Sequence, residues 1–186
     1  MIIEQGAPTL AGLKTANLFP CRFVCKKRLW ANIREFNRTL SHKGIRLIPV
    51  RIGENSVLRY LYRPSKLERD LQNELAAQLL RRFGYKDLTP CGCITELIKR
   101  LEDNGEFPHE IGLFLGYPPE DVEGFVENGG ACCKCSGCWK VYGDECLAKK
   151  KFANFKKCSR VYAEQFSKGK SIERLTVAGL YKMKGW

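Results

Sequence analysis

Ten cysteines fall in small groups along this 186-residue chain, and the densest group is the run CCKCSGC at 132–138. Within it, Cys135 and Cys138 form a Cys-x-x-Cys pair whose loop can place two thiolates on one metal ion. Lys134 and Lys140 flank the pair, and we expect their charges to lower the pKa of the thiols and favour thiolate. The run therefore predicts a thiolate site.

A closed tetrahedral metal site needs two further ligands, and Cys133 and Cys158 are the best placed in the sequence. Cys158 lies at the edge of the apolar stripe of the final predicted helix, which could carry it back to the loop. Soft thiolates suit zinc or an iron–sulfur cluster, and the spacing does not separate the two. Two alternatives stay open: redox-active thiols, or thiols that only pack in the core, in which case no cofactor is bound.

Charge is distributed unevenly along the chain. Residues 1–90 carry 17 Lys and Arg against 7 acids, 91–130 carry 2 against 9, and 131–186 carry 13 against 4, for a net charge of +12. A basic surface attracts polyanions, so RNA or another polyanion is one expected partner of the N-terminal half. The alternative is that the acidic block pairs with its basic flanks within the molecule.

One stretch of the basic half combines aromatic and guanidinium groups: Arg59, Tyr60, Tyr62 and Arg63. On an open sheet, such side chains stack the bases of single-stranded RNA and contact its phosphates. The same residues suit a half-buried strand equally well, with the arginines reaching solvent from apolar stems. Nucleic-acid binding is therefore the alternative to the thiol site.

Residues 108–127 have the spacing of a helix-turn-helix, with Gly112 where the helices cross and Val122 facing the first helix. The second helix carries four acidic residues and no basic one: Glu120, Asp121, Glu123 and Glu127. Carboxylates repel phosphate, which argues against reading DNA. This acidic helical pair is expected either to serve packing alone or to dock an unidentified protein partner.

The elements that must position these groups follow from hydrophobic periodicity. We predict an extended segment over 8–20, a helix over 26–40, a hairpin over 45–52 and 56–63, helices over 65–83 and 91–103, a strand over 138–143 and a helix over 144–167. Pro49 places the first hairpin strand at a sheet edge or a bulge. The order predicts an α+β fold with a small antiparallel or mixed sheet. The strand at 138–143 could complete a ferredoxin-like β-α-β-β-α-β unit.

The length favours a single domain over 1–186, with 91–128 as an acidic helical insertion and 131–143 as a Cys-rich loop and strand. No apolar run is long enough to cross a membrane, and the start, MIIEQGAPTL, lacks the features of a signal peptide. We therefore expect a soluble, cytoplasmic protein with no membrane partner. Phosphate-loop, dinucleotide-binding, serine-hydrolase and zincin motifs are absent, which leaves open whether the protein is an enzyme.

Several stretches together resemble one known family. The runs EFPHEIGLFLGYPPEDVEGFVENGG (106–130), CKCSGCWKVYGDE (133–145) and FKKC (155–158) are similar to the DUF3793 family of clostridial and related anaerobic bacteria, and APTLAGLKTANLF (7–19) and the hairpin fit the same pattern. The resemblance covers essentially the whole chain.

The resemblance implies kinship without activity, because the family has no assigned function. It implies that Cys133 and Cys158 occupy family positions, and the anaerobic lineage favours iron–sulfur or redox chemistry. Family members often carry a cysteine before Ala-Pro-Thr-Leu-Ala-Gly, where this chain has Gly6. No role of that cysteine carries over to this protein.

Overall fold

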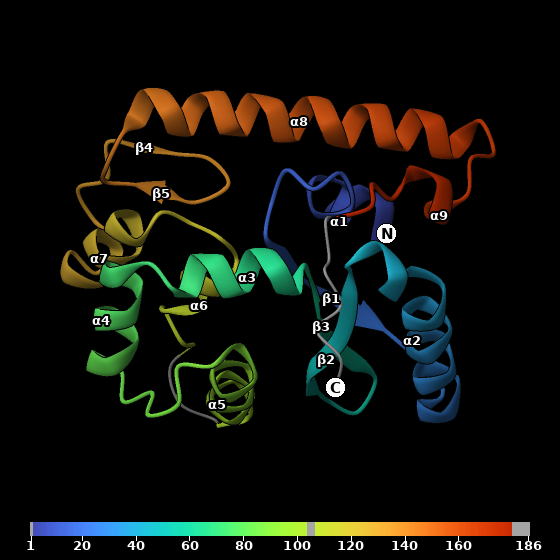
Figure 1. Ribbon diagram of the computed structural model, residues 1–186, viewed down its shortest axis with the longest axis horizontal. Coiled ribbons are helices and arrows are strands. Elements are labelled where there is room, and N and C mark those ends of the chain that lie inside the picture. Colours follow the sequence, from blue (N-terminus) through green and yellow to red (C-terminus); the bar gives the residue numbers. More distant parts are fainter. Residues whose placement is uncertain (1, 104–106, 180–186) are drawn as a thin grey trace. The chain divides into compact units, whose positions relative to one another are not determined.

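The computed structural model describes residues 2–103 and 107–179 (Figure 1). The chain divides into two compact units, one formed by residues up to Lys66 with those from Cys158 onward, the other by Leu67–Lys157. The predicted acidic insertion (91–128) and the Cys-rich loop (131–143) both belong to the second unit.

A three-stranded antiparallel sheet forms the centre of the first unit, with β1 (Ala16–Arg22) and β2 (Arg46–Ile52) on either side of β3 (Ser56–Tyr62). The hairpin of β2 and β3 confirms the sequence prediction. β2 is an edge strand, and its register shifts between Pro49 and Arg51. Both findings agree with the expectation for a strand proline, which cannot donate to the ladder.

The helices of the first unit are α1 (Ile2–Leu10), α2 (Lys26–Leu40), the short 3-10 turn η1 (Ser41–Lys43) and α9 (Ile172–Leu175). The core joins apolar side chains of the sheet to those of the helices: Phe19, Leu47, Val57 and Leu61 from the strands, Leu10 from α1, Leu29, Ile33 and Leu40 from α2, and Leu175 from α9. α2 spans the residues predicted for it.

The predicted extended segment over 8–20 is wrong in its first part. Residues up to Leu10 are helical, and the strand begins at Ala16 and continues through Pro20. Ile3, Ala7 and Leu10 are buried, and their spacings of 4 and 3 residues put them on one helical face. Burial of that face selects the helix.

Gly6 lies where α1 meets the sheet. A Cβ at this position would come within 2.6 Å of Leu61 Cδ2, a contact that real Cβ atoms do not tolerate. A cysteine here would therefore require the Leu61 side chain to move.

The sheet confirms an α+β fold with a small antiparallel sheet, and its strand order and orientations are those of the first three strands of a ferredoxin-like unit. The predicted fourth strand is wrong. β5 (Lys140–Val141) pairs with β4 (Cys135–Ser136) in a separate two-stranded sheet. Two-residue strands and a tight turn favour a local hairpin over a distant sheet edge.

The second unit is mainly helical, and its remaining elements are α3 (Pro64–Leu71, which begins in the first unit), α4 (Glu74–Arg82), α5 (Pro90–Glu102), α6 (Ile111–Phe114), α7 (Pro119–Glu127) and the first half of α8 (Glu145–Ser167). The helix predicted over 65–83 is interrupted at Asn73. The Asn73 side chain accepts a hydrogen bond from the Ala76 amide at 3.1 Å and so starts a new helix.

The crossing of α6 and α7 follows the predicted helix-turn-helix spacing. A Cβ on Gly112 would lie 2.7 Å from Val122 Cγ2, so only glycine permits this approach. Gly116 has a φ of 73°, which suits the turn between the helices. In the described ranges, no helix combines the length and apolar character needed to cross a bilayer.

A buried guanidinium ties distant parts of the first unit together. Arg63, 2% exposed, donates from Nε to Thr9 O at 2.7 Å and from Nη2 to Leu10 O at 2.8 Å and Val177 O at 2.7 Å. Thr9 and Leu10 end α1, where helix carbonyls lack partners within the helix. Arg63 therefore joins the end of α1 and the segment after α9 to the sheet.

Replacing Arg63 by methionine should lower the free energy of unfolding by about 3 kcal/mol or more, because several hydrogen bonds from a charged donor are lost together. Arg51→Met, at an exposed position of β2, is the matched control and should change the free energy of unfolding by less than about 0.5 kcal/mol. Urea denaturation measures both. Equal effects of the two substitutions would contradict this role of Arg63.

Candidate functional site

A single carboxylate fixes the β4–β5 hairpin to α7. Asp121, 4% exposed, accepts hydrogen bonds at Oδ1 from the amides of Tyr142 and Gly143, both at 2.7 Å, and at Oδ2 from Trp139 Nε1 at 2.7 Å. A buried carboxylate is stable when its oxygens are bonded in this way. Asp121 thus sets the position of the Trp139 ring relative to α7.

The ring of Trp139 forms one wall of a pocket of about 300 Å³ within the second unit. Trp139 stacks on Tyr117 with ring centroids 4.8 Å apart and meets Phe152 edge-on at 4.5 Å. Burial raises the pKa of Tyr117 to about 12, so its phenol is neutral at physiological pH. This wall of the pocket is aromatic and uncharged.

Three further rings line the same pocket, those of Phe107, His109 and Phe125. Phe107 is half-exposed, and the His109 ring meets Phe125 edge-on with centroids 5.1 Å apart. The Lys140 ammonium lies 5.8 Å from the centre of the Phe125 ring and donates to Gly130 O. The rings of Phe107, His109, Tyr117, Phe125 and Trp139 therefore surround one cavity.

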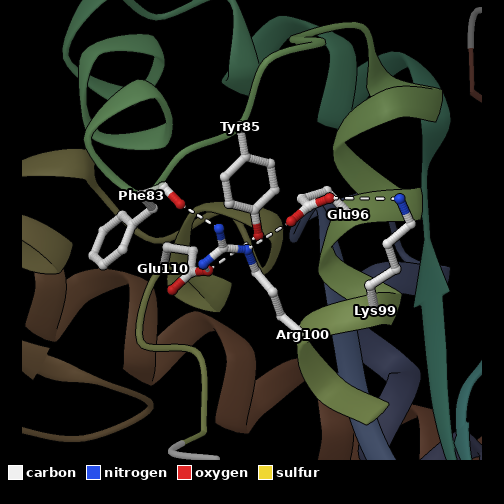
Figure 2. A network of polar contacts seen from close by, with 6 residues as sticks. All are labelled: Phe83, Tyr85, Glu96, Lys99, Arg100 and Glu110. Atoms are coloured by element: carbon white, nitrogen blue, oxygen red, sulfur yellow. Dashed lines mark hydrogen bonds and ion pairs between the residues drawn. The ribbon is translucent and has the colours of Figure 1, made fainter. Parts of the chain in front are cut away.

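A polar network fixes Glu110, the residue that follows His109 in the chain (Figure 2). Glu110, 2% exposed, accepts from the Tyr85 hydroxyl at 3.1 Å and pairs with Arg100 Nη1 at 3.5 Å. Arg100 also bonds Glu96 at 3.2 Å and the Phe83 carbonyl. Burial and the Glu110 charge raise the pKa of Tyr85, which keeps its hydroxyl protonated as the donor.

Glu110 and its neighbour His109 have different surroundings. The Glu110 carboxylate bonds Tyr85 and Arg100, whereas the His109 ring packs on Phe125 in the pocket wall. Adjacent residues at the start of a helix point in different directions. The network therefore positions the pocket wall and leaves the His109 ring at the cavity.

The predicted thiolate loop forms the hairpin beside this pocket. Cys135 is half-buried against the cluster of Trp139 and Val141, and Cys138 is exposed. Burial and the nearby Glu145 carboxylate raise the pKa of Cys135. The expected lowering by Lys134 and Lys140 is wrong for this thiol: the nearby cation that lowers its pKa is Lys149, and burial and Glu145 outweigh that effect.

Gly137 lies between the two cysteines of the pair and directly against α8. A Cβ there would come within 2.3 Å of the Phe152 ring. Close packing of α8 on the hairpin therefore requires glycine. The backbone of Gly137 is not in the left-handed region, so its φ angle does not explain the requirement.

The four predicted metal ligands are divided between the two units. Cys133, Cys135 and Cys138 belong to the second unit, and Cys158 belongs to the first, where it is buried and burial raises its pKa. Over residues 2–103 and 107–179, no three His, Cys, Asp or Glu side chains form a group that could hold a metal ion. Metal binding stays a prediction.

The residues of the nucleic-acid alternative do not form an open face. Arg59 is 8% and Tyr60 0% exposed, Tyr62 is half-buried, and the Arg63 guanidinium is committed to backbone carbonyls. The expectation of an exposed stacking surface is therefore wrong. β3 has buried side chains on both faces, whereas the sequence pattern implied one open face.

The acidic helical pair also presents less charge than its sequence implied. Both carboxylate oxygens of Asp121 accept hydrogen bonds from the hairpin, and Glu123 pairs with Arg82 at 3.3 Å. Docking of a protein through this pair stays a prediction, and it would depend on Glu120 and Glu127.

The sequence pattern did not single out the pocket as a site. Its aromatic rings are far apart in the chain, and Trp139 had been assigned only to a strand. A signal was nevertheless present, because every lining residue falls within two runs of the family resemblance, 106–130 and 133–145.

Asp121→Asn should destabilise the second unit by about 2–4 kcal/mol, because an amide cannot accept all three hydrogen bonds and buries an unmatched donor. Glu123→Gln, on the same helix, removes only a partly exposed ion pair and should cost less than about 1 kcal/mol. Thermal unfolding and the emission of Trp139 measure the difference. Similar losses in both variants would show that Asp121 does not anchor the hairpin.

Comparison with known proteins agrees with the resemblance found in the sequence. No curated protein and no solved structure matches the chain. A family model described as "Protein of unknown function (DUF3793)" matches residues 2–176, which is nearly the entire chain. The chain therefore belongs to the DUF3793 family.

Proposed function

We propose that the second unit binds a small planar aromatic molecule in the pocket beside the β4–β5 hairpin. The observation that carries this proposal is the set of five rings around a cavity of about 300 Å³. Ligand pockets start near this size and are lined mainly by apolar and aromatic groups with a few polar ones. A ligand of one or two fused rings fits these dimensions and can stack on the walls.

The polar groups of the pocket favour a neutral or cationic ligand. The Asp121 oxygens are occupied by the hairpin, and the Lys140 ammonium is directed at a carbonyl and the Phe125 ring. The nearby α7 carries Glu120 and Glu127, which repel anions. Aromatic faces attract cations through their quadrupole.

The pocket is built from the stretches that define the family resemblance. All lining residues come from 106–130 and 133–145, whereas the buried network around Glu110 only supports them. Helix α7, the hairpin and the segment before α6 meet at this cavity. A shared ligand-binding role would account for this concentration of distinctive sequence.

Ligand-detected NMR can test the proposal with quinoline, N-methylquinolinium and quinoline-2-carboxylate as probes. We expect the first two to bind and the anionic probe to bind more weakly. Phe107→Ala should weaken binding about fivefold to tenfold, since it removes one stacking wall at a half-exposed position. Phe166→Ala, with similar exposure on α8 and outside the pocket, is the matched control and should change nothing.

Two outcomes would count against this function. One is failure of all three probes to bind at millimolar concentration. The other is binding that Phe107→Ala and Phe166→Ala affect equally, because such binding would not depend on the pocket.

We also propose that the hairpin thiols take up a soft metal ion such as zinc, or hold an iron–sulfur cluster. The supporting observation is the hairpin itself: Cys135 lies on β4, Cys138 lies in the turn between β4 and β5, and Cys133 precedes β4 by two residues. Thiols on a short hairpin can converge on a metal ion, and of these three Cys138 is exposed whereas Cys133 and Cys135 are half-buried. Cys158 is the predicted fourth ligand.

Anaerobic cobalt(II) titration of the reduced protein should give a thiolate-to-cobalt charge-transfer band, which disappears in Cys135→Ser and Cys138→Ser. Cys25→Ser, at an exposed thiol of the first unit, is the control and should retain the band. Elemental analysis after anaerobic purification separates zinc from iron. A band that survives both hairpin substitutions, or no band at all, would refute metal binding by these thiols.

A further inference from the structure

A second pocket, in the first unit, contains a buried arginine whose donors are unused. Arg59, at the middle of β3, is 8% exposed, and its Nε and Nη2 are buried without a hydrogen-bond partner among the described residues. Arg63, the residue that directly follows β3, donates from all three of its nitrogens. An unmatched buried donor is costly, and a charged one more so, which makes the state of Arg59 exceptional.

The Arg59 side chain lines a cavity of about 390 Å³ between the sheet, α2 and the connection that joins β1 to α2. Its charged lining residues are Arg22, Arg28 and Arg59, and none of the described lining residues is acidic. No carboxylate of the described residues therefore neutralises the guanidinium inside the pocket. The cavity is electropositive and lies in a low-dielectric surrounding.

The two unused nitrogens specify the shape of the missing partner. Nε and Nη2 lie on the same edge of the planar guanidinium and present two parallel N–H groups, which match the two oxygens of a carboxylate. The Phe19 ring lies 5.1 Å from the guanidinium carbon and packs against it. The arginine is thus held in place before any ligand arrives.

The remaining lining residues indicate that the part of the ligand away from the carboxylate is apolar. Phe23, Leu29, Ile33, Phe36 and Leu47 supply apolar walls. Removing an apolar group from water against these walls adds to the affinity. A carboxylate bonded to Arg59 would thus direct an attached hydrocarbon or ring toward α2.

We propose that this pocket binds a small organic carboxylate with an apolar substituent, which reaches Arg59 when the side chains that cover Nε and Nη2 move aside and is then held by a bidentate pair of hydrogen bonds. Arg22 and Arg28 attract the anion to the pocket, and the apolar walls select its substituent. The site lies in a different unit from the aromatic pocket, uses none of its residues and favours the opposite charge. It is therefore a second binding activity of the same chain, independent of the function proposed above.

Isothermal titration calorimetry and thermal shift on the full chain can test the site with benzoate, hexanoate and inorganic phosphate. Benzamide and hexanamide serve as neutral analogues of the same shape. We expect the two carboxylates to bind and to raise the Tm, and the amides to bind at least about tenfold more weakly because they lose the charge-assisted pair. Phosphate should bind more weakly than either carboxylate, since it gains nothing from the apolar walls.

Arg59→Met should leave the Tm of the unliganded protein unchanged or higher, because it removes an unpaired buried charge, and should weaken carboxylate binding about tenfold to hundredfold. Arg51→Met, at an exposed arginine on neighbouring β2, should bind like the wild type. Arg59→Lys keeps the positive charge but lacks the two parallel N–H groups of the guanidinium. It should lose most of the preference for carboxylate over amide. This variant also keeps the test decisive if Arg59→Met does not fold.

The proposal is overturned if neither carboxylate binds, if the amides bind equally well, or if Arg59→Met and Arg59→Lys both retain wild-type affinity. Binding of phosphate alone would overturn the assignment to carboxylates. None of these results affects binding of quinoline to the second unit, so the two proposals fail separately.

Discussion

The first unit depends on one buried guanidinium, that of Arg63. Its N–H groups donate to the backbone carbonyls of three segments that are far apart in the chain: Thr9 and Leu10, Lys43, and Val177. Three strands and short helices bury too little surface to hold such segments without additional ties. Arginine suits this role because its planar group carries five donors and remains charged, whereas lysine would offer a single point charge.

Asp121 has the corresponding role in the second unit, with the opposite charge. There the β4–β5 hairpin has only two-residue strands, so backbone pairing alone would not fix its position. The carboxylate fixes it by accepting two amides and the indole of Trp139. Each unit therefore rests on a buried charge whose hydrogen bonds are satisfied. Arg59 differs from both, because its Nε and Nη2 lack partners. A satisfied buried charge maintains a fold, and an unsatisfied one that faces a cavity indicates a ligand.

Much of the fold could be predicted from local sequence patterns. The periodicity of Leu29, Ile33 and Leu40 identifies α2, Pro49 marks an irregular edge strand, and Gly112 marks a helix crossing. The break at Asn73 and the separate β4–β5 hairpin were missed, because a capping side chain and a local pairing override the longer hydrophobic pattern. The site was harder to predict. Arg63 and Asp121 look like surface charges in a sequence, since burial of a polar residue depends on partners that are distant in the chain.

The uneven charge of the chain takes a different meaning once the pockets are located. A basic N-terminal half suggested a surface for a polyanion, yet three of the four residues expected to form that surface are buried. The cavity in the first unit instead concentrates positive charge at Arg59, while the aromatic pocket is built in part from the acidic stretch 91–130. Field lines focus in enclosed clefts, so local charge decides which ligand enters each one. The net charge of +12 is a sum over the whole chain, whereas the Arg59 cavity is proposed to favour anions and the aromatic pocket neutral or cationic ligands. The sum therefore says little about what either pocket binds.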